Sequence, residues 1–302
     1  MFNFHFSIYL LLLRYKKLRQ MILIADSGST KTDWVLASDD GLVIKSTQTE
    51  GITPVHQTAE YISQVLQSVC LLLVPESSSL AAIYFYGSGI LPSVQSRMEE
   101  MLRQHFPCVP IVEAHSDLLG AARSLCGRSE GIACILGTGA NSCLYDGKQI
   151  VRNTPPLGYI LGDEGSGAVL GKLFLNALFK GVLPVSMLDD YLQSVGMSYS
   201  DIIDRIYRQP MANRFLASTS LFINKHLDSE LLQQIVIDNF RQFVRRNIQP
   251  YQRPDLPLHS IGSIAWHYRE LLQEAVTAEG YILGTVSKSP MKGLLLYHTQ
   301  VS

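Results

Sequence analysis

Residues 26–33 read DSGSTKTD, and this stretch decides how the fold of the chain is interpreted. It follows an apolar run at 22–25 and precedes a second one at 34–37, so a tight turn joins two predicted strands. A turn that exposes consecutive backbone N–H groups makes a nest for phosphate oxygens. A plain hairpin turn explains the same residues without a ligand, and that alternative stays open for this stretch taken alone.

Two further loops of the same kind follow apolar runs. Residues 136–142 read LGTGANS, and residues 261–265 read IGSIA. Glycine permits both a positive φ and a close approach of the backbone to a ligand. A helix start explains the third loop alone, so the order of the three loops along the chain is the informative observation.

The pattern of strands and helices occurs twice. From residue 22, three predicted strands precede alternating helices and strands, and at residue 131 a second run of strands begins. This pattern predicts two related α/β domains. We expect the first domain at 21–128 and the second at 129–289, with a C-terminal helix in 290–302 that returns to the first.

The composition is that of a globular protein without a basic surface. The chain has 302 residues, 47% of them hydrophobic, and a formal net charge of −1. This length allows two hydrophobic cores, and the charge balance argues against a nucleic-acid partner. The five cysteines contain no C-x-x-C pair, which favours reduced thiols in a cytoplasmic protein.

The first twenty residues differ from the rest. An apolar run at 6–13 precedes a basic stretch at 14–19, whereas a secretory signal carries its positive charge first. The run is also shorter than the ~20 residues that a membrane-spanning helix needs. We expect residues 1–20 to be a mis-assigned extension before a start at Met21, with a short membrane anchor as the alternative.

Five motifs together resemble one family. They are DSGSTKT at 26–32, an aspartate that opens a helix at Asp117, LGTGAN at 136–141, LGDEGSG at 161–167 and IGSIA at 261–265. From Met21 to nearly the C-terminus, the sequence resembles the BadF/BadG/BcrA/BcrD ATPases, and most closely their N-acetylglucosamine kinase branch. The resemblance implies an α/β fold of two ribonuclease H-like (actin-like ATPase) domains around a central nucleotide cleft.

The resemblance also implies a site for ATP and Mg²⁺. Asp26 corresponds to the family's aspartate on the metal side. The residues expected to line the γ-phosphate, the other phosphates and the adenosine are Gly28, Ser29, Thr30, Lys31, Gly137, Thr138, Gly139, Gly262 and Ser263.

Asp117 is the catalytic base that the resemblance implies. Phosphoryl transfer needs positioning, a metal ion and a base for the attacking hydroxyl, and little covalent chemistry. One carboxylate for each role is therefore enough. An ordinary helix N-cap is the alternative reading of Asp117.

Sugar recognition is implied for the segment 157–167. Gly158 and Asp163 in this segment, together with Asn141, are the candidate sugar contacts, while a helix cap is the plainer reading of Asp163. Thr53 lies in a GITP segment at 51–54, where the family often has an asparagine. This departure leaves the sugar open between N-acetylglucosamine and a related one such as N-acetylmuramic acid.

Two other functions stay open on the same scaffold. One is an ATPase that activates a radical dehydratase through an iron–sulfur cluster, although the cysteines show no evident cluster pattern. The other is a sugar sensor without catalysis, because fold alone does not settle function. The expected partner is a small amino sugar, with no nucleic acid and no membrane, and a homodimer is left open.

Overall fold

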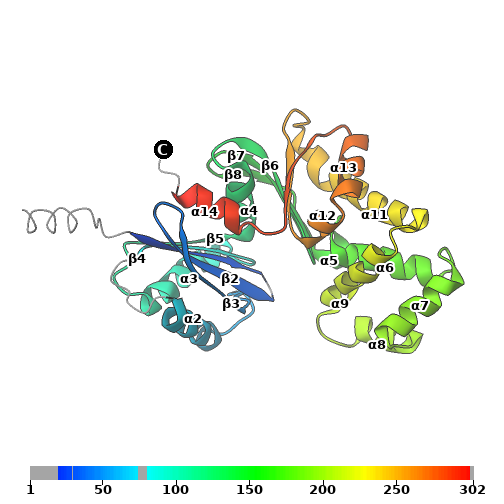
Figure 1. The fold of residues 1–302 in the computed structure, drawn as a ribbon, viewed down its shortest axis with the longest axis horizontal. Coiled ribbons are helices and arrows are strands. Elements are labelled where there is room, and N and C mark those ends of the chain that lie inside the picture. Colours follow the sequence, from blue (N-terminus) through cyan, green and yellow to red (C-terminus); the bar gives the residue numbers. More distant parts are fainter. Residues whose placement is uncertain (1–19, 29, 74–79, 300–302) are drawn as a thin grey trace, which may run out of the picture. The chain divides into compact units, whose positions relative to one another are not determined.

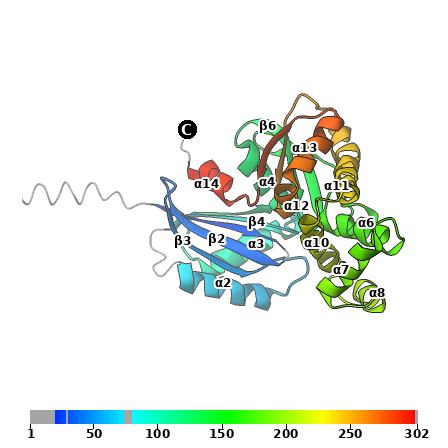
Figure 2. The same cartoon turned by 45° about the vertical axis from the view of Figure 1, so that its right-hand side comes forward.

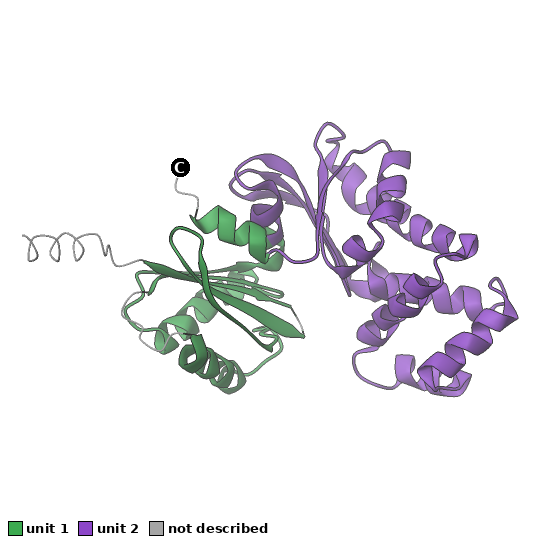
Figure 3. Ribbon diagram, in the orientation of Figure 1, with its two compact units in different colours: residues 1–120, 291–302 green, residues 121–290 purple. Residues whose placement is uncertain are grey.

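The computed structural model describes residues 20–28, 30–73 and 80–299. Of the expected extension at 1–20, residues 1–19 lie outside the described residues. Ser29 also lies outside them. The chain forms two compact units, one of residues 1–120 with 291–302 and one of residues 121–290 (Figure 3). Helix α4 (Asp117–Cys126) carries the chain from one unit into the other. The expected division at 128–129 stays a prediction.

The first unit is built on a mixed sheet of five strands in the order β3-β2-β1-β4-β5 (Figure 1). β1 to β3 pair antiparallel, whereas β4 lies parallel to β1 and β5 parallel to β4. The strands are β1 (Met21–Ser27), β2 (Lys31–Ser38), β3 (Val43–Glu50), β4 (Leu80–Gly87) and β5 (Ile111–Ser116).

Helices cover both faces of this sheet (Figure 2). On one face, Leu23 belongs to a core shared with α2 (Ala59–Leu73) and α3 (Pro92–His105). On the other face, Ile22 and Ile24 pack with Leu294 of α14 (Met291–Thr299). Successive side chains of a strand point to opposite faces, so the continuous apolar run of β1 is buried on both sides.

The second unit repeats the strand order of the first. Its sheet runs β10-β9-β6-β7-β8, with β6 to β8 antiparallel and β9 and β10 parallel to β6. The strands are β6 (Glu130–Leu136), β7 (Ala140–Asp146), β8 (Ile150–Asn153), β9 (Leu258–Ile261) and β10 (Leu283–Ser287). The prediction of two related α/β units is thereby confirmed.

Helices make up most of the second unit. Ile132, Cys134 and Leu136 of β6 enter a core formed largely by α6, α11 and α13. The helices are α5 (Gly158–Leu161), α6 (Gly167–Phe179), α7 (Val185–Val195), α8 (Tyr199–Tyr207), α9 (Ala212–Ser218), α10 (Ser220–Lys225), α11 (Glu230–Phe243), α12 (Ser263–His267) and α13 (Arg269–Ala278). Among the described residues, no helix is both long and apolar enough to cross a membrane.

The helical pattern of residues 229–248 predicts one long helix, and the structure differs from this prediction at its end. α11 ends at Phe243, and the chain continues as a π-helix, Val244–Ile248, and a 3₁₀ turn, Gln249–Tyr251. Pro250 lies in that turn and has no N–H, so it cannot continue the hydrogen bonding of an α-helix. Single π-turns are frequent at functional sites.

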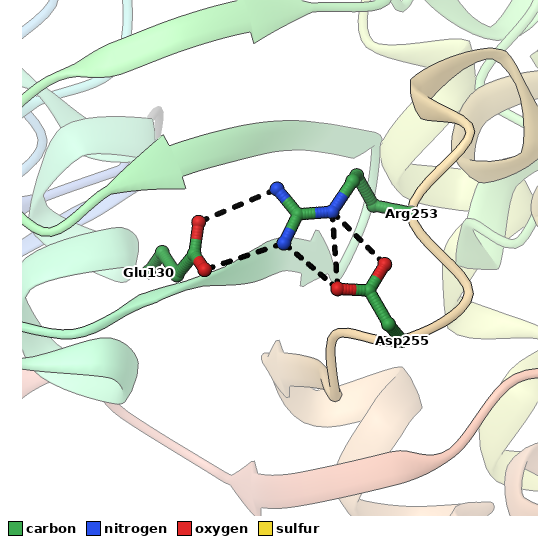
Figure 4. A network of polar contacts seen from close by, with 3 residues as sticks. All are labelled: Glu130, Arg253 and Asp255. Carbon is green, nitrogen blue, oxygen red and sulfur yellow. Dashed lines mark hydrogen bonds and ion pairs between the residues drawn. The ribbon is translucent and has the colours of Figure 1, made fainter.

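An ion network at the surface joins two segments of the second unit (Figure 4). Arg253 donates to Asp255 from Nε and Nη2, at 2.9 Å and 2.8 Å, and to the two carboxylate oxygens of Glu130 at 3.3 Å each. The planar guanidinium suits such paired contacts. The network therefore fixes the first residue of β6 against the segment that leads into β9.

Candidate functional site

Two buried hydroxyl groups, those of Ser27 and Thr32, support the turn between β1 and β2. Ser27 Oγ lies 2.6 Å from Thr32 Oγ1 and accepts a hydrogen bond from the N–H of Ile52 at 2.9 Å. The turn itself closes through the N–H of Gly28, which donates to the carbonyl of Lys31 at 2.9 Å. Gly28, Thr30 and Lys31 are exposed in this turn, where a ligand can reach them.

Lys31 and Thr53 are each next in the chain to a residue that Ser27 contacts, Thr32 and Ile52 respectively. The Lys31 ammonium forms an ion pair with Asp33 at 3.0 Å. Thr53 directly follows Ile52, and its N–H donates to Gln57 Oε1 at 2.7 Å. The hydrogen bonds of Ser27 thus bring the segment of Thr53 to the turn, as a shared site requires.

Asp26 and Asp117 are brought together by the first sheet and the helix that follows it. The pKa of Asp26 is raised to about 7, mainly by burial and then by the carboxylates of Asp117 and Asp33, while Lys31 lowers it. Like charges this close favour binding of a cation. Among the described residues, no cluster of three or more His, Cys, Asp or Glu is arranged for a metal ion. Mg²⁺ usually needs only one or two carboxylates with waters and phosphates, so these residues fit it.

Asp117 is the first residue of α4, but Ser116 makes the capping hydrogen bond. Ser116 Oγ accepts from the N–H of Leu119 at 3.2 Å, which is the N-cap pattern. Asp117 Oδ1 accepts from the N–H of the adjacent Leu118, at 2.8 Å. Burial raises the pKa of the Asp117 carboxyl, and the N–H groups of Leu118 and Asp117 oppose that rise.

Gly120 lets α4 approach the first sheet. A Cβ atom at this position would lie 2.8 Å from the ring of Tyr86 in β4, which is closer than real Cβ contacts. Only glycine fits here without a shift of the helix. Gly120 was not among the predicted site residues, yet it sets where Asp117 lies.

In the second unit, the 137–139 loop rests on the first turn of α6. The N–H of Gly167 donates to the carbonyl of Gly137 at 2.8 Å, and the N–H of Ala168 donates to the carbonyl of Thr138 at 3.1 Å. The N–H groups of Thr138 and Gly139 make no hydrogen bond to any described residue. The loop thus turns carbonyls toward the helix and keeps N–H groups for a ligand.

Asp163 lies against the same loop. Its backbone is left-handed, with φ 55°, and a Cβ on Gly139 would come within 3.1 Å of its Oδ2 atom. Burial raises the pKa of Asp163, the N–H of Ala140 and Lys172 lower it, and Glu164 raises it. The structure therefore brings two of the sequence motifs, LGTGAN and LGDEGSG, into contact.

The third glycine loop adjoins the second. Gly262 has φ 125°, and a Cβ there would lie 2.3 Å from the carbonyl oxygen of Leu136. Glycine is therefore required, and Ser263 begins α12 beside this contact. Gly158 also has a positive φ, 72°, but the space around it is open.

Asn141 is held by its neighbours on β7 and β8. Its Oδ1 atom accepts from the N–H of Ser142 and from Nδ2 of Asn153, both at 2.9 Å. Its own Nδ2 group makes no hydrogen bond to a described residue. The side chain is thus oriented through its oxygen and keeps a donor for a ligand.

Several residues that hold the LGDEGSG segment were not among the predicted site residues. Asn239 of α11 is fully buried; its Oδ1 accepts from the N–H of Gly165 at 3.0 Å, and its Nδ2 donates to the carbonyl of Ser166 at 3.2 Å. Glu164 is bound by Arg246 and Asn247, at 3.2 Å each. The one signal in the sequence that could have indicated Asn239 is its position, as a polar residue, on the apolar face of a helix.

A surface pocket of about 700 Å³ in the first unit does not coincide with these carboxylates. Thr30 and Lys31 line one end of it, and the rest comes from β3 and α2, including Glu50 and Tyr61. Asp26 and Asp117 are not among its lining residues. The candidate residues thus form one group in each unit, and the pocket adjoins the first group only at Thr30 and Lys31.

Comparisons with known proteins complete these observations. No protein family model and no curated protein matches the chain. The solved structure of a candidate N-acetylglucosamine kinase from Porphyromonas gingivalis is 50% identical, with a TM-score of 0.90, over 92% of this chain and 99% of that chain.

Two more distant structures share the fold alone. A candidate N-acetylglucosamine kinase from Chromobacterium violaceum is 18% identical, with a TM-score of 0.69, over 93% of this chain and 99% of that one. A candidate N-acetylmannosamine kinase from Listeria monocytogenes is 15% identical, with a TM-score of 0.51, over 93% and 98%.

Proposed function

The chain belongs to the N-acetylglucosamine kinase-like family of actin-like ATPases, and we propose that it phosphorylates an N-acetylated amino sugar with ATP. The observation that carries this proposal is the pair of carboxylates, Asp26 and Asp117, in which burial and mutual repulsion raise the pKa of Asp26 to about 7. A phosphotransferase needs such a pair, one carboxylate for the metal side and one for the base.

Asp117 is the proposed base. As the sugar hydroxyl oxygen bonds to the γ-phosphorus, Asp117 takes the proton of that hydroxyl, and the bond from the γ-phosphorus to the bridging oxygen breaks to release ADP. Burial raises the pKa of Asp117 toward the working pH, which favours proton acceptance. Because Ser116 caps α4, the Asp117 carboxylate is not needed as a cap.

Asp26 is the proposed residue on the metal side. Mg²⁺, when bound with ATP, offsets the negative charge of the phosphates. Asp26 would hold the ion directly or through waters. The neighbouring exposed residues Thr30 and Lys31 would contact the γ-phosphate, together with Gly28 and Ser29.

The second unit would bind the rest of the nucleotide. The free N–H groups of Thr138 and Gly139 suit phosphate oxygens, and α6 supports the loop that presents them. Gly137 lies at the contact with Gly262, and Gly262 and Ser263 would meet the adenosine beside the phosphates.

Asn141 and Asp163 are the proposed sugar contacts of the second unit, with Gly158 beside them and Thr53 from the first. A carboxylate and an amide recognise sugar hydroxyls and the N-acetyl group because an unpaired buried polar group is costly. N-acetylglucosamine is the first expectation, and N-acetylmuramic acid is the larger alternative.

A coupled assay of ADP formation over a sugar panel tests the proposal. The panel is N-acetylglucosamine, N-acetylmannosamine, N-acetylmuramic acid and glucose, each with and without Mg²⁺. We expect ADP formation that depends on an N-acetylated sugar and on Mg²⁺, and that Asp117→Asn abolishes. Folded protein that forms no ADP with any of these sugars contradicts the proposal.

A further inference from the structure

Asn247 of the π-helix is almost fully buried, with 5% of its surface exposed. It lies between the segments of Asn141 and Asp163, the two side chains that the proposed function assigns to the sugar within the second unit. Its side chain binds one segment, and its backbone carbonyl binds the other. A buried polar residue with two such arms fixes the segments relative to each other.

The side-chain arm reaches the segment of Asp163. Asn247 Nδ2 donates to Glu164 Oε2 at 3.2 Å, while Arg246 Nη1 donates to the other oxygen of Glu164, also at 3.2 Å. A carboxylate only accepts hydrogen bonds, so the amide nitrogen must face Glu164. The peptide that joins Asp163 to Glu164 is thereby tied to the π-helix.

The backbone arm reaches the segment of Asn141. The carbonyl oxygen of Asn247 accepts from Ser142 Oγ at 3.3 Å and from Thr154 Oγ1 at 2.9 Å. Ser142 directly follows Asn141, and Asn153, which donates to Asn141 Oδ1, directly precedes Thr154. The carbonyl of Asn247 therefore binds Ser142, which contacts Asn141 directly, and Thr154, which adjoins Asn153 in the chain.

Tyr251 completes this arm. Its hydroxyl accepts from the N–H of Thr154 at 3.0 Å and lies 2.7 Å from Ser142 Oγ. When the tyrosine donates to Ser142 Oγ, the serine hydroxyl is free to donate to Asn247. Pro250, three residues after Asn247, has no N–H that could compete for the carbonyl.

We propose that Asn247 is a positioning residue that sets the separation of Asn141 and Asp163, and thereby the selectivity for the sugar. This inference rests on the proposed function. Asn247 itself need not touch the substrate. The 137–139 loop is supported separately, by the N–H groups of Gly167 and Ala168, so the phosphates should be bound independently of Asn247.

Steady-state kinetics test whether Asn247 has this positioning role. Asn247→Ala removes the side-chain contact, and the double variant Ser142→Ala, Thr154→Val removes the contacts of the backbone carbonyl. A misplacement of about 1 Å can cost ~100-fold in rate or affinity. We expect either variant to raise the KM for the amino sugar about 10- to 100-fold and to narrow the preference for N-acetylated over plain sugars. The KM for ATP should change less than about threefold, since its loop is held by α6.

Arg245→Ala is the matched control. Arg245 lies in the same π-helix, but its guanidinium binds Glu279, so its loss disturbs the helix without touching either sugar segment. We expect its sugar KM to stay within about twofold of the wild type. Should Asn247→Ala fail to fold, Glu164→Gln tests the side-chain arm with volume conserved, and a rise of about three- to tenfold in sugar KM is expected.

Hydrogen exchange separates this inference from the proposed function. Asn247→Ala should speed amide exchange in 163–166, the double variant Ser142→Ala, Thr154→Val should speed it in 141–154, and Arg245→Ala should speed it in neither segment. If the wild type phosphorylates no sugar, the proposed function fails and the assignment of Asn247 to sugar selectivity falls with it, whatever the exchange shows. With an active wild type, folded variants whose sugar and ATP constants both stay unchanged, or shift equally, overturn the inference.

Discussion

Asp26 near the end of β1 interacts electrostatically with Asp117 at the start of α4, and burial together with the Asp117 carboxylate raises the pKa of Asp26 to about 7. An aspartate that titrates near neutral pH makes both stability and metal binding depend on pH. The two effects have opposite directions and can be measured separately.

Stability without Mg²⁺ should fall as the pH rises. The pKa of Asp26 in the folded protein is about 7, above its ordinary value of 3.8, so the folded state binds the proton more tightly than the unfolded state. The stabilising contribution is full below about pH 4 and is lost through pH 7. Between pH 5 and 8 the wild type should lose roughly 2–3 kcal/mol relative to Asp26→Asn.

Urea unfolding followed by Trp34 fluorescence measures this difference. Trp34 is fully buried in the first unit, and a Trp266→Phe background removes the other tryptophan. Equal pH dependence in the wild type and Asp26→Asn would show that Asp26 does not titrate near 7.

Binding of Mg²⁺ should strengthen as the pH rises. Metal ligands bind in their deprotonated form, and Asp26, with its pKa of about 7, is mostly protonated at pH 6. Apparent affinity for Mg²⁺ in the presence of ATP should therefore be about tenfold weaker at pH 6 than at pH 8. Calorimetry checks this, and Asp26→Asn should bind more weakly and lose the pH dependence. A dependence that survives in the variant assigns the titration to another group.

Asp117→Asn and Ser116→Ala should separate catalysis from helix capping. Loss of a general base usually costs about 10²–10⁴ in rate, so Asp117→Asn should lose kcat with little change in stability. Ser116→Ala removes the cap of α4 and should cost about 1 kcal/mol of stability. Near-normal kcat in Asp117→Asn would mean that the base lies elsewhere.

Asn239→Ala should destabilise the second unit and weaken nucleotide binding. The variant leaves the N–H of Gly165 and the carbonyl of Ser166 without their partner inside the protein. Each unsatisfied buried group costs about 1–3 kcal/mol. Thermal unfolding and ATP calorimetry measure both effects, and Asp238→Ala, on the exposed side of the same helix, is the control. Unchanged ATP affinity in a destabilised Asn239→Ala would limit the role of Asn239 to stability.

Gly120→Ala should lower kcat through the position of Asp117. The added methyl would lie 2.8 Å from the Tyr86 ring, so α4 must shift, and a shift of about 1 Å can cost ~100-fold in rate. Tyr86→Leu in the same chain makes room for the methyl and should restore part of the loss, a coupling that the double-mutant cycle measures. Additive effects of the two changes would contradict a steric cause.

The sequence predicted the strands and glycine loops because both depend on local pattern. Three predicted features agree with the structure to within a few residues: the apolar run of β1, the DSGSTKTD turn and the second run of strands after residue 131. The repeated sheet order followed from that repetition. Helix ends were less predictable: the helical pattern of residues 229–248 continues past the end of α11 at Phe243.

The supports of the candidate site were not predictable, since they join segments far apart in the chain. Asn239 binds Gly165 across more than seventy residues, and Asn247 binds Glu164 across more than eighty. Neither contact has a local pattern. The π-helix also escaped prediction, because the apolar periodicity of α11 runs into it without a break.

The packing of α14 has a consequence for synthesis on the ribosome. Ile22 and Ile24 of β1 are made about 270 residues before their partner Leu294. At ~5–20 residues per second, that face of the first sheet stays uncovered for roughly 14 to 54 s. A nascent chain with a bare apolar sheet is a ready client for chaperones, and its folding completes only after release of the last helix from the exit tunnel.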